Sequence, residues 1–292
     1  MSLDAWAAAE FFRSEPSSFI SVGDAEVAHR RIGTGPDVLF VHGWPVSGAT
    51  FRKLLPHLVD HVTCHVIDLP GAGSSRYSPD SSLTLHTHIA SVRRVIDHLD
   101  LTDVAVVGHD SGGLIARHAM AGDPRLRALG LIDTEPSGSM SWKFRTFLAG
   151  RHVPGFGRAL GWLVGRPRLR RHPLILGDAF VDRSFLDGEF DEFFLRPLAE
   201  SPTHRLAMTR LLKSFDYGLI HELGTLHRRI DVPVVLVWGE NDRFFPVPAA
   251  RSMLTEFSSA HIDLIPGAGL FSHEERPDLV ARALLPTLTH AQ

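Results

Sequence analysis

Residues 104–113 read Val-Ala-Val-Val-Gly-His-Asp-Ser-Gly-Gly, a short apolar run followed at once by a turn rich in glycine. The apolar run predicts a buried strand, and Leu114 to Met120 predicts a helix after it. Gly108 and Gly112 stand two residues before and after Asp110, where a strained turn between strand and helix leaves no room for Cβ atoms. This arrangement is typical of a nucleophile elbow, in which the central residue is usually Ser and is here Asp110.

Ser111 is the other candidate nucleophile in this turn. With Ser111 at the centre, His109 would stand where the elbow needs a small residue, so Asp110 is favoured. An ordinary glycine-rich turn without chemistry is the alternative interpretation. The strand before the turn and the helix after it favour the functional one.

Short apolar runs alternate with amphipathic stretches along most of the chain. The runs lie at residues 37–42, 64–68, 104–108, 129–132, 234–238 and 262–265, and helical periods lie at residues 85–99, 114–120 and 247–257. Continuous apolar strands that alternate with helices predict an α/β fold, with a mostly parallel central sheet flanked by helices on both faces.

One segment, from about Pro136 to Arg229, interrupts this alternation. It has no clear buried strand, and it carries many aromatic residues among prolines and glycines. It predicts a helical cap inserted after the sixth strand of the sheet. We therefore expect a core domain formed by residues 1–135 and 230–292, and a cap domain formed by residues 136–229.

The composition excludes several classes of protein. Apolar residues make up 44% of the chain, and 30 basic side chains balance 33 acidic ones, which gives no sign of a nucleic-acid-binding protein. No apolar run is long enough to span a membrane. The first residues, Met1 to Ala9, lack the pattern of a signal peptide, so we expect a cytoplasmic protein. The single cysteine, Cys64, is expected to be a small core residue.

Four blocks, at residues 42–45, 68–75, 108–113 and 239–246, resemble the aspartate-nucleophile branch of the α/β hydrolases. That branch contains haloalkane dehalogenases, haloacetate dehalogenases and epoxide hydrolases. The resemblance covers nearly the whole chain, and the cap is its poorly matched part. It implies an α/β-hydrolase fold and an enzyme that acts on a small-molecule substrate without metal or cofactor. A homodimer is a possible assembly.

The resemblance also implies an oxyanion hole. The loop His42-Gly-Trp44-Pro follows the first long buried strand, and in this fold the loop gives one backbone N–H while the residue after the nucleophile gives the other. These donors are expected to be Trp44 and Ser111. The glycine-rich loop at residues 68–75 is interpreted as structural.

Two aspartates compete for the acid that orients a catalytic histidine. Asp242 lies in Trp238-Gly-Glu-Asn-Asp242, which resembles the acid loop of the family after the seventh strand. Asp133 ends the sixth strand, where some members of the family place the acid. We favour Asp242 and keep Asp133 as the alternative, with a structural role as its other interpretation.

The histidine is where this sequence departs from the family pattern. The pattern places it directly after a glycine and seven residues before a proline, and here Leu270 holds that position. His273 lies three residues further, about one helical turn, and is the candidate base. The alternatives are that the base is missing, so that Asp110 forms an ester and stops, or that His273 is a surface residue.

The leaving group decides the substrate class. A carboxylate nucleophile attacks a saturated carbon and forms an alkyl-enzyme ester, which a water then hydrolyses. A dehalogenase-like activity on a carbon–halogen bond is expected first, with Trp44, Tyr217 and His152 as leaving-group contacts. Epoxide hydrolysis is the alternative, since Tyr217 is the only tyrosine of the cap and epoxide hydrolases commonly use two.

Two further interpretations stay open. A binding or scaffolding protein that kept the fold and lost turnover is favoured by Leu270. The cap also carries eight basic residues and no acidic one between Lys143 and Arg171. We favour the interpretation that this run is a solvated outer face. The alternative is that it binds an anionic substrate, a membrane surface or an acidic partner.

Overall fold

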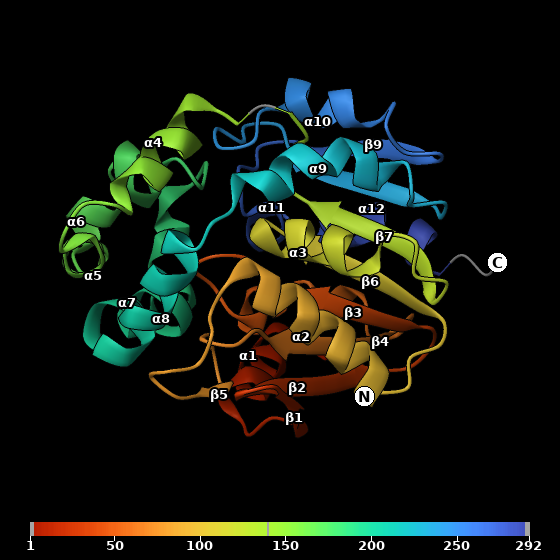
Figure 1. Ribbon diagram of the computed structural model, residues 1–292, viewed down its shortest axis with the longest axis horizontal. Coiled ribbons are helices and arrows are strands. Elements are labelled where there is room, and N and C mark those ends of the chain that lie inside the picture. Colours follow the sequence, from red (N-terminus) through yellow and green to blue (C-terminus); the bar gives the residue numbers. More distant parts are fainter. Residues whose placement is uncertain (1–2, 139, 290–292) are drawn as a thin grey trace.

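The computed structural model describes residues 3–138 and 140–289. Met1 and Ser2, which begin the segment in which no signal peptide was found, lie outside the described residues. Within these ranges the core of the protein is a nine-stranded sheet (Figure 1). Its strands are β1 (Ser18–Val22), β2 (Ala25–Gly33), β3 (Asp37–Val41), β4 (Thr63–Asp68), β5 (Arg76–Tyr77), β6 (Val104–His109), β7 (Leu126–Ile132), β8 (Val234–Gly239) and β9 (Ala260–Ile265).

The strands follow the spatial order β1-β2-β4-β3-β6-β7-β8-β9, and β5 pairs with β2 at one edge. The pairs from β4 to β9 are parallel, whereas β1, β4 and β5 pair with β2 in antiparallel fashion. The prediction of a mostly parallel sheet is confirmed, and the antiparallel edge of β1, β2 and β5 was not predicted.

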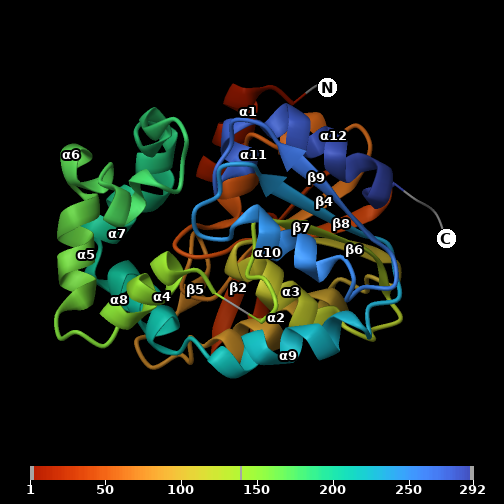
Figure 2. The same cartoon turned by 90° about the horizontal axis from the view of Figure 1, so that it is seen from above.

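Helices cover both faces of the sheet, as expected. The α-helices of the structure, those of the expected cap included, are α1 (Ala5–Arg13), α2 (Leu85–His98), α3 (Ser111–Met120), α4 (Trp142–Gly150), α5 (Phe156–Val164), α6 (Pro167–Arg170), α7 (Arg196–Glu200), α8 (Pro202–Lys213), α9 (Tyr217–His227), α10 (Val247–Met253), α11 (Ser272–Glu275) and α12 (Pro277–Leu288). Helices α2, α3 and α9 lie on one face, and α1 and α12 lie on the other (Figures 1 and 2).

The core forms where the sequence is most apolar. Every residue of β6 and of α3 is buried, and these two elements contact each other directly. Cys64 is also fully buried, in β4, and burial raises the pKa of its thiol to about 12. Such a thiol is a small core side chain rather than a reactive one.

Helices α4 to α8 stand apart from the sheet as a separate group beside the core (Figures 1 and 2). They lie between β7 and β8 in the sequence, which is the segment expected to form the cap. Helix α9, which the division at residue 229 assigns to the cap, contacts α3 over the sheet. That division into two domains stays a prediction.

None of the helices within residues 3–138 and 140–289 combines the length and the apolar composition that a membrane crossing requires.

Candidate active site

The elbow places Asp110 at the junction of β6 and α3 in a strained backbone conformation. Its φ is +52°, in the left-handed region that few residues other than glycine adopt. Gly112 allows the turn, because a Cβ atom there would lie 2.1 Å from the backbone oxygen of Val41. A side chain at this glycine would therefore push α3 away from the end of the neighbouring strand β3, and one at Gly108 would meet the backbone of α3 at Gly112, as the sequence pattern predicted for an elbow.

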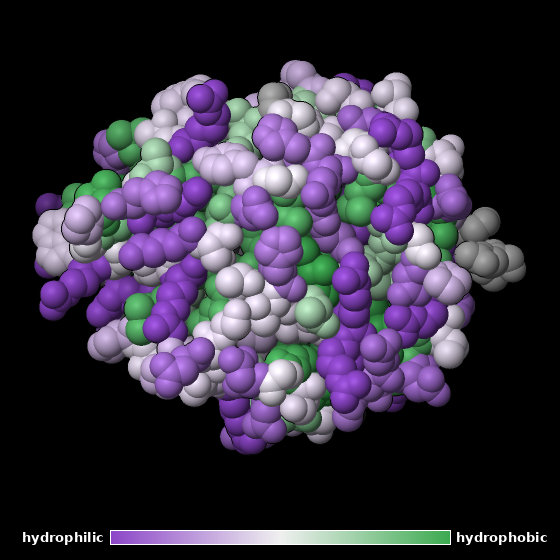
Figure 3. All heavy atoms as spheres, viewed as in Figure 1, coloured by the Kyte–Doolittle hydropathy of each residue, from purple (hydrophilic) through white to green (hydrophobic). Residues whose placement is uncertain are grey.

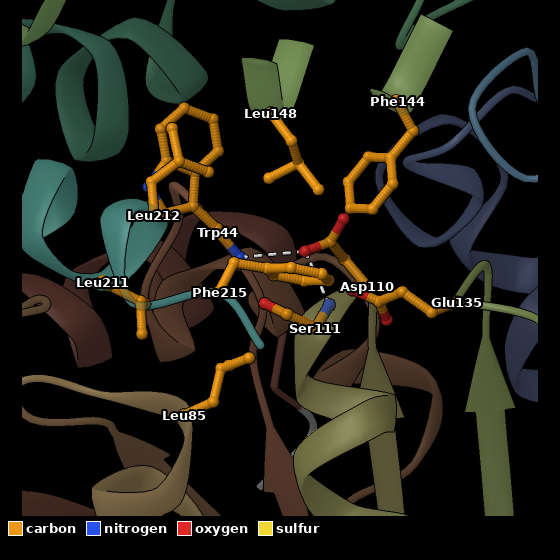
Figure 4. Close-up of a pocket in the computed structure, with 10 residues that line it drawn as sticks. All are labelled: Trp44, Leu85, Asp110, Ser111, Glu135, Phe144, Leu148, Leu211, Leu212 and Phe215. Carbon is orange, nitrogen blue, oxygen red and sulfur yellow. Dashed lines mark hydrogen bonds between the residues drawn. The ribbon is translucent and has the colours of Figure 1, made fainter. Parts of the chain in front are cut away.

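Two backbone N–H groups hold one oxygen of the Asp110 carboxylate. Its Oδ1 accepts from the N–H of Trp44 at 3.0 Å and from the N–H of Ser111 at 2.6 Å. These are the two groups predicted to form the oxyanion hole. The other carboxylate oxygen points away from both N–H groups (Figure 4). The two oxygens of Asp110 therefore have different surroundings.

Asp110 lies at the floor of a cavity between the core and the cap (Figure 4). The cavity has about 360 Å³ of empty space, part of it open to solvent. Its lining is mostly apolar, and Asp110 and Glu135 are its two ionisable side chains. The lining residues are Trp44, Leu85, Asp110, Ser111, Glu135, Phe144, Leu148, Leu211, Leu212 and Phe215.

The two candidate acids differ in how their oxygens are bonded. Both oxygens of Asp133 are occupied, Oδ1 by the N–H of Gly239 and Oδ2 by the hydroxyl of Ser272. In Asp242, Oδ1 accepts from the N–H groups of Phe244 and Phe245, while Oδ2 is buried without a hydrogen-bond partner among the described residues. Asp242 therefore has an oxygen without a partner among the described residues, whereas each oxygen of Asp133 already accepts a hydrogen bond.

His273 lies in the buried helix α11, outside the cavity lining. Its Nε2 bonds the hydroxyl of Thr50 at 2.8 Å, its ring centroid is 4.3 Å from that of His109, and its Nδ1 has no partner among the described residues. Burial, with the charges of Arg52 and Lys53, lowers the pKa of His273 to about 3. The ring is thus neutral, and no hydrogen bond within the described ranges joins it to Asp110, Asp133 or Asp242. Its role as base stays a prediction.

Leu270 lies in the loop between β9 and α11. Hydrogen bonds join this loop to the edge of the sheet that carries the elbow. The backbone oxygen of Leu270 accepts from Nε2 of His109, next to Asp110, at 3.0 Å. Ala268 in the same loop accepts from the N–H of Asn241, next to Asp242. Leu270 itself is buried. The position that the family gives to histidine is therefore filled by an apolar side chain close to the elbow and the acid loop.

Of the three predicted contacts with the leaving group, Trp44 lines the cavity and the other two do not. Tyr217 and His152 are not among the residues that line the cavity, and Tyr217 is 37% exposed. The indole N–H of Trp44 donates to the backbone oxygen of Met208 in α8 at 3.1 Å, so that bond joins the oxyanion loop to the cap. The roles of these three side chains toward a leaving group stay predictions.

The basic run of the cap is partly paired within the cap itself. Lys143 bonds Asp178, and Arg170 and Arg171 both bond Asp187. Hydrophilic side chains are spread over the face seen in Figure 3, the cap included, with apolar ones between them. This pairing supports the interpretation of a solvated face over that of an anion-binding surface.

Glu135 is the site residue that the sequence reasoning missed. It lies three residues beyond β7, its side chain is 1% exposed, and its Oε1 is buried without a hydrogen-bond partner among the described residues. The signal available in the sequence was a second acidic residue, two positions after Asp133, at the same end of the same strand.

The four carboxyl groups of this region all have raised pKa values, and burial is the largest cause in each. The pKa is about 6 for Asp110, about 7 for Asp242 and about 8 for Glu135, and that of Asp133 is well above its usual range. The negative charge of Asp110 adds to the rise at Asp242 and Glu135, whereas its own two N–H donors oppose the rise at Asp110. Asp110 has a lower pKa than Asp242 and Glu135 and so ionises more readily than either, as a nucleophile requires.

These shifts predict that Glu135 makes the stability of the protein depend on pH. Its pKa is higher in the folded chain than in the unfolded chain, so the unfolded chain releases the proton first. The stability that the neutral carboxyl contributes is complete below the unfolded value and is lost as the pH rises toward about 8. We compare the free energy of unfolding of Glu135→Gln with that of the wild type. We expect the variant's value minus the wild-type value to rise by on the order of a few kcal/mol between about pH 5 and about pH 9.

Urea unfolding of both proteins at these two pH values measures this difference. Taking the difference between the variant and the wild type cancels the contributions of the buried histidines, which are the same in both. A gap that stays constant from one pH to the other would show that Glu135 is ionised throughout.

No group of three or more histidine, cysteine or acidic side chains placed to hold a metal ion occurs within residues 3–138 and 140–289.

Comparison with known proteins agrees with this fold. The model of the alpha/beta hydrolase fold family matches residues 36–277. A pimeloyl-[acyl-carrier protein] methyl ester esterase of Xanthomonas campestris is 29% identical over 87% of this chain and 95% of its own. A haloalkane dehalogenase of Mesorhizobium japonicum is 27% identical over 91% of this chain and 89% of its own.

The solved structures include an epoxide hydrolase, CorEH, with a TM-score of 0.76 at 21% identity over 92% of this chain and 97% of its own. A sheet of this order with an elbow after β6 defines an α/β hydrolase. Since the family model covers most of the chain, the protein belongs to the alpha/beta hydrolase fold family. The α/β-hydrolase fold and the membership of the alpha/beta hydrolase family, both inferred from the four sequence blocks, are confirmed.

Proposed function

We propose that this protein is a hydrolase whose Asp110 carboxylate displaces a leaving group from a saturated carbon and forms an alkyl-enzyme ester. The observation that carries the proposal is the unequal bonding of the two carboxylate oxygens. Oδ1 is held by the N–H groups of Trp44 and Ser111, which leaves the other oxygen to attack the substrate. Oδ1 then becomes the carbonyl oxygen of the ester, already in the place where N–H donors stabilise negative charge when water attacks.

The lining of the cavity supports a small apolar substrate. Aromatic and leucine side chains surround Asp110, and a dry apolar wall strengthens the attack of a carboxylate on carbon. A carbon–halogen bond is the first candidate, because a halide leaves without needing a proton, and the similarity to a haloalkane dehalogenase supports it. Epoxide hydrolysis is the second candidate, favoured by the carboxyl of Glu135, which can protonate an oxygen leaving group.

An ester substrate is a poorer match, although one of the relatives is a methyl ester esterase. A carboxylate that attacks an ester carbonyl forms a mixed anhydride, whereas the same carboxylate forms a simple ester when it attacks saturated carbon. The identity of Asp110 at the centre of the elbow therefore separates this protein from a typical esterase of the same fold.

Two further parts of the sequence interpretation remain proposals. His273 is the base proposed from the sequence; its Nε2 bonds the hydroxyl of Thr50, and the residue is not among those that line the cavity. The unpartnered Oδ2 of Asp242 and the apolar Leu270 support the alternative of a protein that forms the ester and hydrolyses it slowly. A cytoplasmic location and a homodimer also remain proposals.

Incubation with an alkyl bromide or with an epoxide tests the proposal. We expect the intact mass of the wild type to rise by the alkyl fragment, and bromide to be released in the first case. Release of more than one equivalent of product per protein molecule would distinguish an enzyme from a protein that stops at the ester. The absence of both a mass change and product with a broad panel of bromides and epoxides would contradict the proposal.

A further inference from the structure

Glu135 reaches the same cavity as Asp110 and has no part in the mechanism inferred from the sequence. Figure 4 shows its side chain beside that of Asp110 at the floor of the cavity. The cavity lining contains no histidine and no lysine. Among the lining residues, Glu135 is thus the one ionisable group besides the nucleophile.

The hydroxyl of Thr134 links the carboxyl of Glu135 to the backbone of the nucleophile. The hydroxyl oxygen of Thr134 lies 3.0 Å from Nη2 of Arg117, 2.7 Å from the backbone oxygen of Asp110 and 3.0 Å from Oε2 of Glu135. Arg117 can only donate to this oxygen, so the single hydroxyl proton has two acceptors within reach, the backbone oxygen of Asp110 at the shorter distance and the carboxyl of Glu135. When the hydroxyl donates to Asp110, the contact with Glu135 is a hydrogen bond only if the carboxyl of Glu135 is protonated and donates, which is the state that an acid role requires.

Electrostatics around Glu135 change when Asp110 is esterified. Burial and the negative charge of Asp110 keep the proton on Glu135, and the charge of Arg117 opposes them. Forming the ester removes the charge of Asp110, and with it one of the two causes that hold the proton. Glu135 is therefore a better acid after the nucleophile has reacted than before.

We propose that Glu135 is the acid–base residue of the Asp110 site, first donating its proton to the leaving group and then activating the water that hydrolyses the ester. This inference rests on the proposed ester at Asp110. A carboxyl that acts as acid in one step and as base in the next is known from other hydrolases with two carboxylates. The role matters most for an oxygen leaving group, which departs as an alcohol only if it is protonated.

The two steps balance as follows for an epoxide. An oxygen of Asp110 bonds to the ring carbon, the carbon–oxygen bond of the ring breaks, and the proton of Glu135 moves to the departing oxygen. The carboxylate of Glu135 then takes a proton from water as the hydroxide bonds to the ester carbonyl carbon of Asp110. Collapse of this intermediate breaks its bond to the alkoxide, which takes the proton of the added hydroxyl. Asp110 is again a carboxylate and Glu135 is again protonated.

The test compares the wild type with Glu135→Gln, using 1-bromobutane and styrene oxide as probes and intact mass as the readout. Glutamine keeps the size of the side chain and can still donate to Thr134, but it cannot transfer a proton. We expect the bromide to esterify Asp110 at a similar rate in both proteins, because bromide takes no proton. In the wild-type ester Glu135 then releases its proton to solvent, since the charge of Asp110 is gone, and acts as the base, so we expect the variant ester to decay about 100-fold more slowly. We expect the epoxide to esterify the variant about 100-fold more slowly than the wild type.

Glu240→Gln is the matched control, because Glu240 is an exposed carboxyl in the acid loop at the end of β8 and is absent from the cavity lining. It should behave as the wild type in both steps. Wild-type rates in Glu135→Gln, with an ester at Asp110, would overturn the role of Glu135 and leave the proposed function intact. So would accumulation of the ester in His273→Gln but not in Glu135→Gln. A wild type that forms no ester with either probe would instead contradict the proposed function.

Discussion

Asp110→Asn is expected to abolish formation of the alkyl ester and to lower hydrolysis of the substrate by at least about four orders of magnitude, as loss of a catalytic carboxylate or nucleophile does in other hydrolases. The amide nitrogen and oxygen of Asn are far weaker nucleophiles than a carboxylate. The backbone of the elbow should tolerate Asn, which adopts a positive φ more readily than most residues do. Intact mass and product release, measured on freshly prepared protein before the amide hydrolyses, give both quantities.

Ser111→Ala is the matched control for this variant. Ser111 lines the same cavity and contributes its backbone N–H to Oδ1 of Asp110, and that N–H is retained in Ala. Ester formation in Ser111→Ala should therefore stay within a small factor of the wild type. Labelling that persists in Asp110→Asn and disappears in Ser111→Ala would make Ser111 the nucleophile.

Leu270→His is the second change with a large expected effect, and here the effect is a gain. The loop that carries Leu270 is bonded to His109 and Asn241, which adjoin Asp110 and Asp242 in the sequence. Oδ2 of Asp242 is buried without a partner, so an imidazole at residue 270 would find an acceptor that fixes its tautomer. We expect the ester at Asp110 to decay about 100-fold faster, at the lower end of what general base catalysis contributes.

Decay of the isolated ester, followed by mass after the excess probe is removed, measures this gain. An imidazole beside the partly ionised Asp242 should have a pKa raised above the usual value of about 6.5, so the gain should begin to fade while the pH is still above that value. Leu270→Gln is the control, because it adds a polar side chain of similar size that accepts no proton near neutral pH. Equal decay in the two variants would show that residue 270 does not reach the ester.

The fold could be predicted because its signals are local and strong. Residues 104–108 and 234–238 are apolar runs that the sheet buries completely, and the elbow needs glycines at fixed positions. The antiparallel edge escaped prediction because β2 buries polar side chains. Arg30 in that strand is buried beside the carboxylate of Asp68, a partner 38 residues away whose position no local pattern gives.

The site could be predicted only where a motif fixes its geometry. The N–H groups of Trp44 and Ser111 meet at Asp110 because the loop and the elbow both follow parallel strands that pair side by side. The surroundings of Glu135 depend instead on contacts with Thr134 and with Arg117 from α3.

The position of His273 depends in the same way on how its loop returns to the sheet. The hydroxyl of Ser272 binds Asp133 at the start of α11, and the next side chain, His273, is then directed to Thr50. Spacing from the family pattern gives the distance along the chain from Leu270 to His273, but it does not give the direction of the side chain. That direction is set by a hydrogen bond between residues 139 positions apart.

The most direct test of the central claim is the mass of the peptide that carries Asp110 after one turnover in water labelled with ¹⁸O. In the proposed reaction water attacks the ester carbonyl of Asp110, so the labelled oxygen enters the carboxylate of that residue first. We expect the peptide either to gain one ¹⁸O or, if hydrolysis of the ester is slow, to retain the alkyl fragment. A peptide that is unlabelled and unmodified, together with ¹⁸O in the alcohol product of the first turnover, would contradict the account.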